Sequence, residues 1–451
     1  MSEDEPRVSH EAERLGPAPP VPAVATEDTG SLRRLLGVAT IDLTPLRRHR
    51  DYRLLFAGQA LSFFGAMLTY VAIPFQVYHL TGSPLALGLL SLAELVPLLF
   101  TAFIGGALAD AVDRRRMLQL AEAALGLATA ILFFNSLLDE PKVWVLFVVA
   151  PLMAALDGFQ RPALDSMVPR LVARHELTAA AALDSLRGEF GMIAGPAIGG
   201  VLIATIGLPA TYGIDIATYG ASVVALALMR AIPPPPDAVP PSVKSILEGF
   251  KYAWSRQELL GSYGVDMVAM FFGMPMALFP AIATQYGGAE VLGLLYAAPS
   301  VGALVASLTS GWAARVHRHG LAIIWAAGSW GLAIAVFGLV TNLWVALVFL
   351  ALAGAADMIS GIFRGTLWNQ TIPDRLRGRL AGIEQVSYSS GPLLGNLESG
   401  VVASLFSVRA SVVSGGVLCV AGVAIFALFL PAFRHYDSRA PLTASPSEGA
   451  L

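Results

Sequence analysis

Long apolar stretches constrain the fold of this chain most, because each is about as long as a helix that crosses a lipid bilayer. A bilayer core about 30 Å thick requires roughly 20 consecutive, mostly apolar residues per helix. Twelve stretches meet this requirement, at approximately residues 54–80, 85–109, 117–138, 143–164, 179–205, 210–230, 261–283, 290–312, 320–341, 344–366, 380–404 and 409–431. Their apolar runs are continuous rather than alternating, which predicts helices and not a barrel. The sequence therefore predicts an all-α integral membrane protein with twelve transmembrane helices.

The composition agrees with this assignment and argues against several functions. Hydrophobic residues make up 55% of the chain and charged residues 14%, against about 25% charged residues in soluble domains. The net charge of −3 gives no reason to expect a nucleic-acid partner. The histidines lie outside or at the edges of the predicted spans, and neither a histidine–glutamate zinc motif nor a phosphate loop occurs. We therefore expect no metal, no cofactor and no enzymatic activity.

Basic residues orient the predicted bundle. Of the 29 Lys and Arg, only Lys142 and Arg409 fall in segments that lie outside if the N-terminus is inside. The positive-inside rule then places both termini in the cytoplasm. Residues 1–50 lack the pattern of a cleavable signal peptide, so we expect the first helix to act as the insertion signal. Residues 1–50 and 434–451 are interpreted as cytoplasmic tails, disordered in residues 1–50 and after Asp437.

One polar linker divides the predicted spans into two sets of six. It covers residues 232–260 and opens with a run of prolines from Pro233 to Pro236. Its later part places these apolar residues on one helical face: Val243, Ile246, Leu247, Phe250 and Trp254. This spacing predicts an amphipathic helix on the inner membrane surface, acting as a spacer or in regulation. The two membrane domains are then residues 51–231 and 261–433.

The two halves share an internal repeat. The pair Gly88 and Gly106 recurs as Gly293 and Gly311 at an offset of 205, and the Gly-Pro-x-x-Gly run of residues 195–199 recurs at an offset of 196. Several matches at nearly constant offset indicate a duplicated six-helix unit with both halves in the same orientation. This is a transporter architecture, in which the substrate binds between the halves and one half rocks against the other.

A motif after the second span resembles the cytoplasmic loop motif of the major facilitator superfamily. It reads Gly105-Gly106-Ala-Leu-Ala-Asp110-Ala-Val-Asp113-Arg114-Arg115-Arg116. It departs from the family pattern at Ala111, where a basic residue is expected, and at Asp113, where a glycine is expected. The resemblance implies the major facilitator fold and a gate that stabilises the inward-closed state and contains Gly106, Asp110, Arg114 and Arg115. The alternative is that the arginines only enforce topology.

A second motif, in the fifth span, resembles one that is characteristic of antiport exporters in this superfamily. Its residues are Gly191, Gly195, Pro196, Gly199 and Gly200. Tight helix packing and a proline bend would also explain this pattern.

Three further segments are Leu292-Gly-Leu-Leu-Tyr-Ala-Ala-Pro, Leu308-Thr-Ser-Gly-Trp-Ala-Ala and Phe433-Arg-His-Tyr. Through these segments the chain is similar, over residues 45–437, to the enterobactin-exporter branch of siderophore and drug efflux proteins. The resemblance implies secondary active export of a small molecule across the bacterial cytoplasmic membrane. It makes a catecholate siderophore the first candidate cargo and proton antiport the expected energy source. Multidrug efflux is the alternative function within the superfamily. Uptake of the small molecule, instead of its export, is a further alternative. We expect a monomer whose partners are its small-molecule substrate, protons and the bilayer, and we favour neither a membrane enzyme nor a sensor.

Charges inside the membrane are the candidates for proton and substrate binding, because each is costly there and needs an explanation. Glu94 lies near mid-depth of the second span without a basic neighbour at helical spacing, which suits a proton carrier or a neutral hydrogen-bonded acid. Asp157 and Arg161 share a face of the fourth span, and Asp357 and Arg364 share a face of the tenth. The arginines are candidates for binding an anionic substrate, with an internal salt bridge as the alternative.

The fifth and eleventh spans complete the set of candidates with Glu189, Glu384 and Glu398. The eleventh span is too polar to face lipid all round, so we expect one face to meet water or substrate. Asp215 and Asp266 lie near helix ends, where a capping or interface role is expected. Several aromatic residues in the spans could form a wall for a bulky ligand, or could instead pack in the core or against lipid. They are Phe63, Phe64, Tyr70, Phe271, Phe272, Phe279 and Tyr296.

Overall fold

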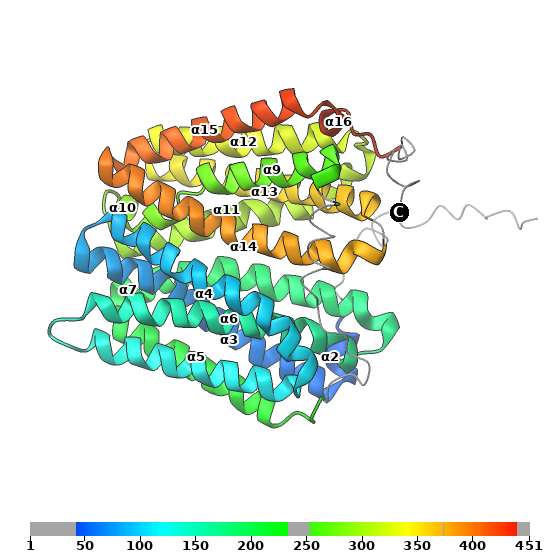
Figure 1. The fold of residues 1–451 in the computed structure, drawn as a ribbon. Helices are drawn as coiled ribbons and strands as arrows, with labels where there is room; N and C mark the ends of the chain where they lie inside the picture. Colours follow the sequence, from blue (N-terminus) through cyan, green and yellow to red (C-terminus); the bar gives the residue numbers. More distant parts are fainter. Residues whose placement is uncertain (1–41, 233–251, 253, 373, 440–451) are drawn as a thin grey trace, which may run out of the picture. The chain divides into compact units, whose positions relative to one another are not determined.

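The apolar stretches form long helices that lie side by side, and helices are the only regular elements among the described residues (Figure 1). The computed structural model describes residues 42–232, 252, 254–372 and 374–439. Within these ranges, the side chains of residues 102–111, 162, 165 and 374–387 are not described. From Leu43 onward the chain forms one compact unit.

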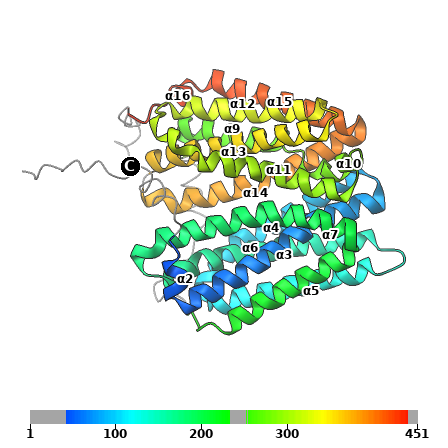
Figure 2. The same ribbon diagram turned by 180° about the vertical axis from the view of Figure 1, so that it is seen from behind.

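The helices fall into two groups that follow the two halves of the sequence (Figures 1 and 2). The N-terminal half contains α2 (Thr44–Arg48), α3 (Arg50–Thr81), α4 (Pro84–Ala111), α5 (Arg114–Ser136), α6 (Val143–Leu171) and α7 (Leu177–Ala227). The C-terminal half contains α9 (Gln257–Phe272), α10 (Phe279–Ala283), α11 (Ala289–Leu308), α12 (His319–Leu339), α13 (Leu343–Thr371), α14 (Asp374–Leu405), α15 (Val408–Phe429) and α16 (Pro431–Arg434). Short 3-10 helices are η1 (Arg174–Glu176), η2 (Met276–Leu278) and η3 (Ser310–Arg315).

The length and composition of these helices agree with the predicted spans. Among the described residues, 10 helical stretches are long and apolar enough to cross a membrane. One of them, α7, consists of two helices joined at a kink, because Gly207 has φ 83° and ψ 172°. In addition, α14 has 32 residues and is long enough to cross as well. The arrangement is consistent with the twelve spans that the sequence predicts.

The seventh predicted span, residues 261–283, is not the continuous helix that we predicted. α9 ends at Phe272, and η2 and α10 follow a break at residues 273–275. Inside a bilayer, the backbone groups freed by such a break must find partners within the protein. Side chains of α12, α11 and α14 supply them: Trp330 Nε1 donates to Gly273 O (3.1 Å), Tyr296 OH donates to Met276 O (3.1 Å), and Asn396 Oδ1 accepts from Ala277 N (3.1 Å). The break is therefore stabilised by neighbouring helices that the local sequence does not reveal.

The two halves contact each other mainly through two pairs of helices, α4 with α14 and α7 with α11. Each contact brings together two glycines from opposite halves, Gly88 with Gly400 and Gly200 with Gly293. A Cβ atom on Gly400 would lie 2.9 Å from the Gly88 Cα, and one on Gly200 would lie 2.8 Å from the Gly293 Cα. No side chain fits at such distances unless the backbones move apart. Gly88 and Gly293 are the repeat glycines at the offset of 205, so the repeat corresponds to two equivalent contacts.

Both glycine contacts lie at the same end of the bundle. Gly88 and Gly293 stand near the N-terminal ends of α4 and α11, and Gly400 stands near the C-terminal end of α14. The opposite end of the bundle carries α2 and α16 (Figure 1). The halves are thus held together closely at the end that lies away from α2 and α16.

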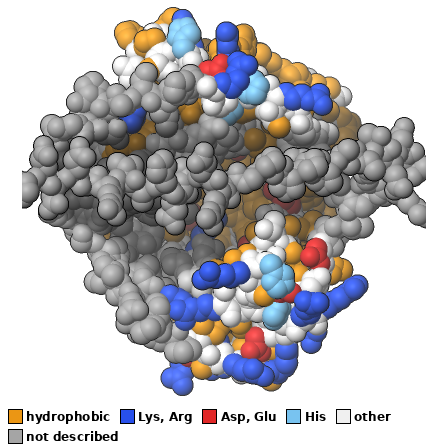
Figure 3. Space-filling view, turned by 90° about the vertical axis from the view of Figure 1, so that its right-hand side faces the viewer, with side chains coloured by type: hydrophobic (Ala, Val, Ile, Leu, Met, Phe, Trp, Pro, Cys, Tyr) orange, Lys and Arg blue, Asp and Glu red, His pale blue; other side chains and the backbone are white. Residues whose placement is uncertain are grey.

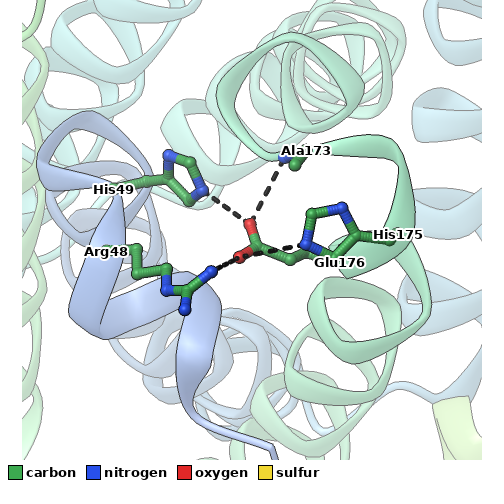
Figure 4. A network of polar contacts seen from close by, with 5 residues as sticks. All are labelled: Arg48, His49, Ala173, His175 and Glu176. Carbon is green, nitrogen blue, oxygen red and sulfur yellow. Dashed lines mark hydrogen bonds and ion pairs between the residues drawn. The ribbon is translucent and has the colours of Figure 1, made fainter.

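At the end that carries α2, the carboxylate of Glu176 fixes this short helix to the turn between α6 and α7 (Figure 4). His49 Nε2 lies 2.6 Å from Glu176 Oε2, and Arg48 Nη1 lies 3.6 Å from Glu176 Oε1. Ala173 N donates to Glu176 Oε2 at 3.3 Å, and His175 Nε2 lies 3.9 Å from Glu176 Oε1. Glu176 is buried, so these contacts anchor the start of α3 to the rest of the N-terminal half.

The predicted amphipathic helix of the linker falls mostly outside the described residues. Of the apolar face that we proposed for it, Trp254 alone is described, and its side chain is exposed. The predicted tails, apart from residues 42–50 and 434–439, are likewise outside the described ranges.

We predict that Gly207→Ala lowers the free energy of unfolding by about 1–3 kcal/mol, because a φ of 83° with a ψ of 172° suits only glycine. Thermal melting of the purified protein in detergent measures this effect. Gly220→Ala is the matched control, because Gly220 lies in the same helix with open space where a Cβ would be. Equal melting temperatures for the two variants would contradict a requirement for glycine at the kink.

Candidate functional site

Asp157 and Arg161 lie near the middle of α6, and both residues are exposed. Within the described part of the chain, no ion pair joins them, so the salt bridge that we considered is not formed. Charged side chains at the middle of a membrane helix face water or polar protein rather than lipid. The exposed face of α6 is therefore the wall of a polar space inside the bundle.

Tyr388 of α14 lies close to charged residues of both halves. It is within electrostatic range of Arg161 and Glu189 from the N-terminal half and of Asp357 and Arg364 from the C-terminal half. The Tyr388 residue is 55% exposed. Four charged residues selected from the sequence therefore meet around one tyrosine that the sequence analysis did not select. We call the space around these five residues the central chamber.

Arg364 is the most deeply buried charge of the central chamber. Its side chain is 6% exposed and forms an ion pair with Asp266 of α9. A second carboxylate oxygen, Asp357 Oδ1, lies 3.6 Å from Arg364 Nη2. We expected Asp266 to cap a helix or to lie at an interface. It does not cap a helix, and its ion pair joins α9 to α13. Asp266 is buried inside the C-terminal half, where a desolvated guanidinium requires a counter-charge.

A cavity of about 140 Å³ adjoins Arg364 and Tyr388. Its walls include Tyr263 and Trp368, whose rings stack with their centroids 5.0 Å apart. The Trp368 Nε1 atom is buried and has no hydrogen-bond partner in the described part of the chain. The volume is comparable to that of a protein cavity that holds a benzene-sized ring. The cavity thus offers aromatic faces, an N–H donor and a nearby guanidinium to a ring-shaped group.

Aromatic residues from both halves meet close to the break between α9 and α10. Tyr70 of α3 and Tyr296 of α11 form a T-shaped pair with ring centroids 5.4 Å apart. Phe279 packs against Tyr296 with a centroid distance of 5.0 Å. The Tyr70 hydroxyl donates to Met276 Sδ at 3.8 Å. These contacts place three of the aromatic residues that we interpreted as a wall in one cluster that bridges the halves.

Glu94 of α4 is partly buried and belongs to the same polar region as the central chamber. It lies within electrostatic range of Tyr70, Tyr296 and Asp157. No basic side chain in the described ranges forms an ion pair with Glu94, as its helical spacing predicts. Both roles that we considered for it, proton carrier and neutral hydrogen-bonded acid, stay predictions.

The remaining acidic candidates occupy different surroundings. Glu189 of α7 and Glu398 of α14 are both partly buried. Glu398 Oε2 is buried without a hydrogen-bond partner among the side chains that the structure describes. The side chain of Glu384 lies outside the described residues.

The motif of the fifth span packs α7 against two helices. Gly191, Gly195 and Gly199 face α3, where added Cβ atoms would meet side chains of that helix. Gly200 faces α11 of the other half, and the Pro196 carbonyl oxygen also borders that helix. Close packing therefore accounts for the spacing of the motif, and its connection with export stays a prediction.

The loop motif after the second span lies partly outside the described side chains, namely at Gly106 and Asp110. Arg114 begins α5 and is buried. Arg115 Nη1 donates to Met229 O at 2.5 Å, just beyond the C-terminal end of α7. A cation at the end of a helix is favourable because free carbonyl groups gather there. The gating role of these residues stays a prediction.

Two further carboxyls of the N-terminal half are fully buried. Asp215 is fully buried in α7 and accepts hydrogen bonds from Thr69 (2.5 Å), Thr129 (3.3 Å) and Thr218 (3.3 Å). We expected a capping or interface role. Asp215 does not cap a helix end, and its bonds to Thr69 and Thr129 join α7 to α3 and α5. Glu122 of α5 is also fully buried, and we did not select it. An acidic residue inside the third apolar stretch was the signal that would have identified it.

The two related halves and the central chamber between them define this protein as a multi-pass membrane transporter of the major facilitator type. Residues 40–448 match a protein family described as transmembrane secretion effector. The chain belongs to this family. The family and its relatives are membrane transporters and not enzymes.

Curated relatives agree with the resemblance that the sequence motifs carry. The enterobactin exporter EntS of Escherichia coli K12 is 31% identical over 420 residues, covering 90% of this chain and 98% of that protein. The enterobactin exporter EntS of Citrobacter koseri is 31% identical over 411 residues, covering 89% of this chain and 97% of that protein.

Solved structures confirm the major facilitator fold. A bacterial homologue of the iron transporter ferroportin in an inward-facing state has a TM-score of 0.64 at 15% identity, covering 85% of this chain and 98% of that chain. The nucleoside transporter NupG has a TM-score of 0.66 at 12% identity, covering 84% of this chain and 98% of that chain.

We predict that Asp266→Asn destabilises the protein by about 3–5 kcal/mol, because removing one partner of a buried ion pair leaves a charge uncompensated. Asp357→Asn is the matched control and should cost less, since its carboxylate is 35% exposed and lies 3.6 Å from Arg364. Thermal melting of both variants in the same detergent measures the difference. A larger loss for Asp357→Asn would show that Asp266 is not the main partner of Arg364.

Proposed function

We propose that this protein is a secondary active exporter of a catecholate siderophore, which leaves the bacterial cytoplasm in exchange for protons. The observation that carries the proposal is the 31% identity with enterobactin exporters over 90% of the chain. The central chamber supports it with arginines from both halves, Arg161 and Arg364, and with the adjoining aromatic cavity.

A catechol ring matches the groups that the central chamber presents. The ring fits a cavity of about 140 Å³, where it can lie against Tyr263 and Trp368. The Trp368 N–H can donate to a catechol oxygen, because it has no other acceptor among the described residues. Arg364 is already neutralised by Asp266, whereas Arg161 has no ion pair in the described ranges. We infer that Arg161 is the cation that meets the negative charge of the cargo.

Proton exchange follows from acidic groups that lack a counter-charge. Glu94, Asp157 and Glu189 form no ion pair with a basic side chain in the described part of the chain. Such carboxyls are more stable in the neutral form when desolvated and ionise where water enters. A chamber that opens to each side in turn lets these groups take up protons outside and release them inside. The glycine contacts between the halves form the closed end in this scheme.

We infer that both termini lie in the cytoplasm. Lys and Arg side chains gather on the rims of both halves at the end of the bundle where α2 and α16 lie (Figure 3). The positive-inside rule assigns such an end to the cytoplasm. The end held closed by the glycine contacts is then external, and cargo enters the chamber from the cytoplasm.

Export of hydrophobic cationic drugs is the second candidate function, and the acidic and aromatic groups favour it. Glu94 and Asp157 supply negative charge close to the cluster of Tyr70, Phe279 and Tyr296. Aromatic faces and carboxylates together bind organic cations.

Efflux from proteoliposomes tests the proposed function. Vesicles loaded with enterobactin, and matched vesicles loaded with the cationic dye ethidium, are diluted into medium more acidic than the lumen, with and without a protonophore. We expect enterobactin to leave faster than from protein-free vesicles, and the protonophore to remove the acceleration. Faster movement of ethidium with no effect on enterobactin would favour drug efflux. Movement of neither solute would overturn the proposal.

We predict that Arg161→Gln raises the half-saturating enterobactin concentration roughly tenfold or more, since a hydrogen bond to a charged group contributes about 1.5–3 kcal/mol. Initial efflux rates over a series of internal concentrations measure this change. Lys142→Gln, in the exposed turn between α5 and α6, is the control. An unchanged half-saturating concentration in Arg161→Gln would exclude Arg161 from cargo binding.

A further inference from the structure

Glu122 is a fully buried carboxyl that the proposed cargo site does not use. Its oxygen Oε1 accepts from two side-chain amides, Gln59 Nε2 at 2.7 Å and Gln160 Nε2 at 2.5 Å. Its oxygen Oε2 accepts from Ser62 Oγ at 2.6 Å. Ser222 of α7 is a further hydrogen-bond partner. Because the other donors belong to α3 and α6, the carboxyl of α5 joins four helices of the N-terminal half.

No positive charge balances this carboxyl among the residues that the structure describes. Its four hydrogen-bond partners, Gln59, Ser62, Gln160 and Ser222 of α7, are neutral. The ionisable groups of α6 and α7 within electrostatic range of it are all acids: Asp157, Asp215 and Tyr219. Arg187 of α7 reaches the Gln59 carbonyl oxygen, but its charge is paired with Asp184 at 2.6 Å. A desolvated negative charge at Glu122 is therefore opposed by its surroundings, whereas a neutral carboxyl is not.

The two oxygens of Glu122 differ in a way that determines where a proton can bind. Oε1 accepts from two amide N–H groups, which only donate. Oε2 faces the Ser62 hydroxyl, which can either donate or accept. A proton on Oε2 therefore requires only that Ser62 turn from donor to acceptor. Both amide bonds to Oε1 remain in place.

Gln160 connects this buried group to the central chamber. It precedes Arg161 on α6, lies one helical turn after Asp157 and is partly exposed. In an antiporter, cargo and proton bind in turn. Cargo bound at Arg161 would hold α6 so that the Gln160 amide donates to Oε1, which favours the ionised carboxyl and release of the proton. Loss of that donor after the cargo leaves favours the protonated carboxyl.

We propose that Glu122 is a proton-binding site of this transporter and that Gln160 links its protonation to cargo in the central chamber. The coupling rests on the proton antiport of the proposed function, whereas proton binding itself does not. The proton adds to Glu122 Oε2 and forms an O–H group that donates to Ser62 Oγ. On release the proton passes to water in the chamber, and no other covalent bond changes.

Infrared difference spectroscopy tests proton binding without any need for transport. The full-length protein in lipid nanodiscs is titrated with acid and base, and the carbonyl band of protonated carboxylic acids is followed. We expect one titrating component to be missing from Glu122→Gln and present in Glu140→Gln, whose side chain is exposed in the α5–α6 turn. In Glu122→Asp, which keeps a carboxyl at the site, a shifted component should remain. Identical spectra for wild type and Glu122→Gln would overturn the proposal.

Proteoliposome transport tests the coupling. Glu122→Gln mimics the protonated carboxyl, because its amide can donate to Ser62 while its oxygen still accepts from both glutamines. We expect that a pH gradient no longer accelerates enterobactin efflux by this variant. The rate of enterobactin exchange at equal pH on both sides of the membrane should be reduced less than the gradient-driven rate. Glu140→Gln should behave as wild type in both assays. Acceleration equal to wild type in Glu122→Gln would overturn the coupling role.

Failure of the wild type itself to move enterobactin would overturn the proposed function. The infrared titration would still decide whether Glu122 binds a proton.

Discussion

The absence of water from the hydrocarbon core of a bilayer is the constraint on which the rest of this structure depends, because every buried polar group must find its partner inside the protein. The broken helix between α9 and α10 meets this requirement with hydrogen bonds from α11, α12 and α14. The buried guanidinium of Arg364 meets it with Asp266. The carboxyl of Glu122, which faces no cation among the described residues, meets it with neutral donors from neighbouring helices. Each solution draws on helices far apart in the sequence.

Close approach of backbones holds the two halves together. Lipid chains are as apolar as leucine side chains, so apolar contact alone gives little reason for helices to associate in a membrane. Glycines at Gly88, Gly400, Gly200 and Gly293 remove the side chains that would keep the helices apart. Because the repeat places these contacts symmetrically, the two halves meet on both sides of the central chamber. Charges from both halves then gather around Tyr388.

Much of the candidate site was predictable from helical spacing. Asp157 with Arg161, and Asp357 with Arg364, share faces of single helices. The structure places Arg161, Asp357 and Arg364 at the central chamber, and Asp157 lies one helical turn from Arg161 on α6. Tyr388 and Asp266 were not selected as site residues, because spacing along one helix does not reveal its rotation against its neighbours. Glu122 shows the same difficulty: its depth in the third span is plain from the sequence, whereas the donors around it come from other helices.

The sequence by itself determined the class of fold, the approximate helix boundaries, the repeat and the family resemblance. These features follow from the local apolar character and from short motifs. Both lie within single helices, so they can be recognised without knowing how the helices pack. Only the tertiary structure decided which charges pair, where a helix breaks and which carboxyl stays without a cation. Those outcomes depend on side chains from separate helices meeting at distances of about 3 Å, where hydrogen bonds form. A one-dimensional pattern gives the depth of a residue in the membrane, and packing alone gives the direction in which it points.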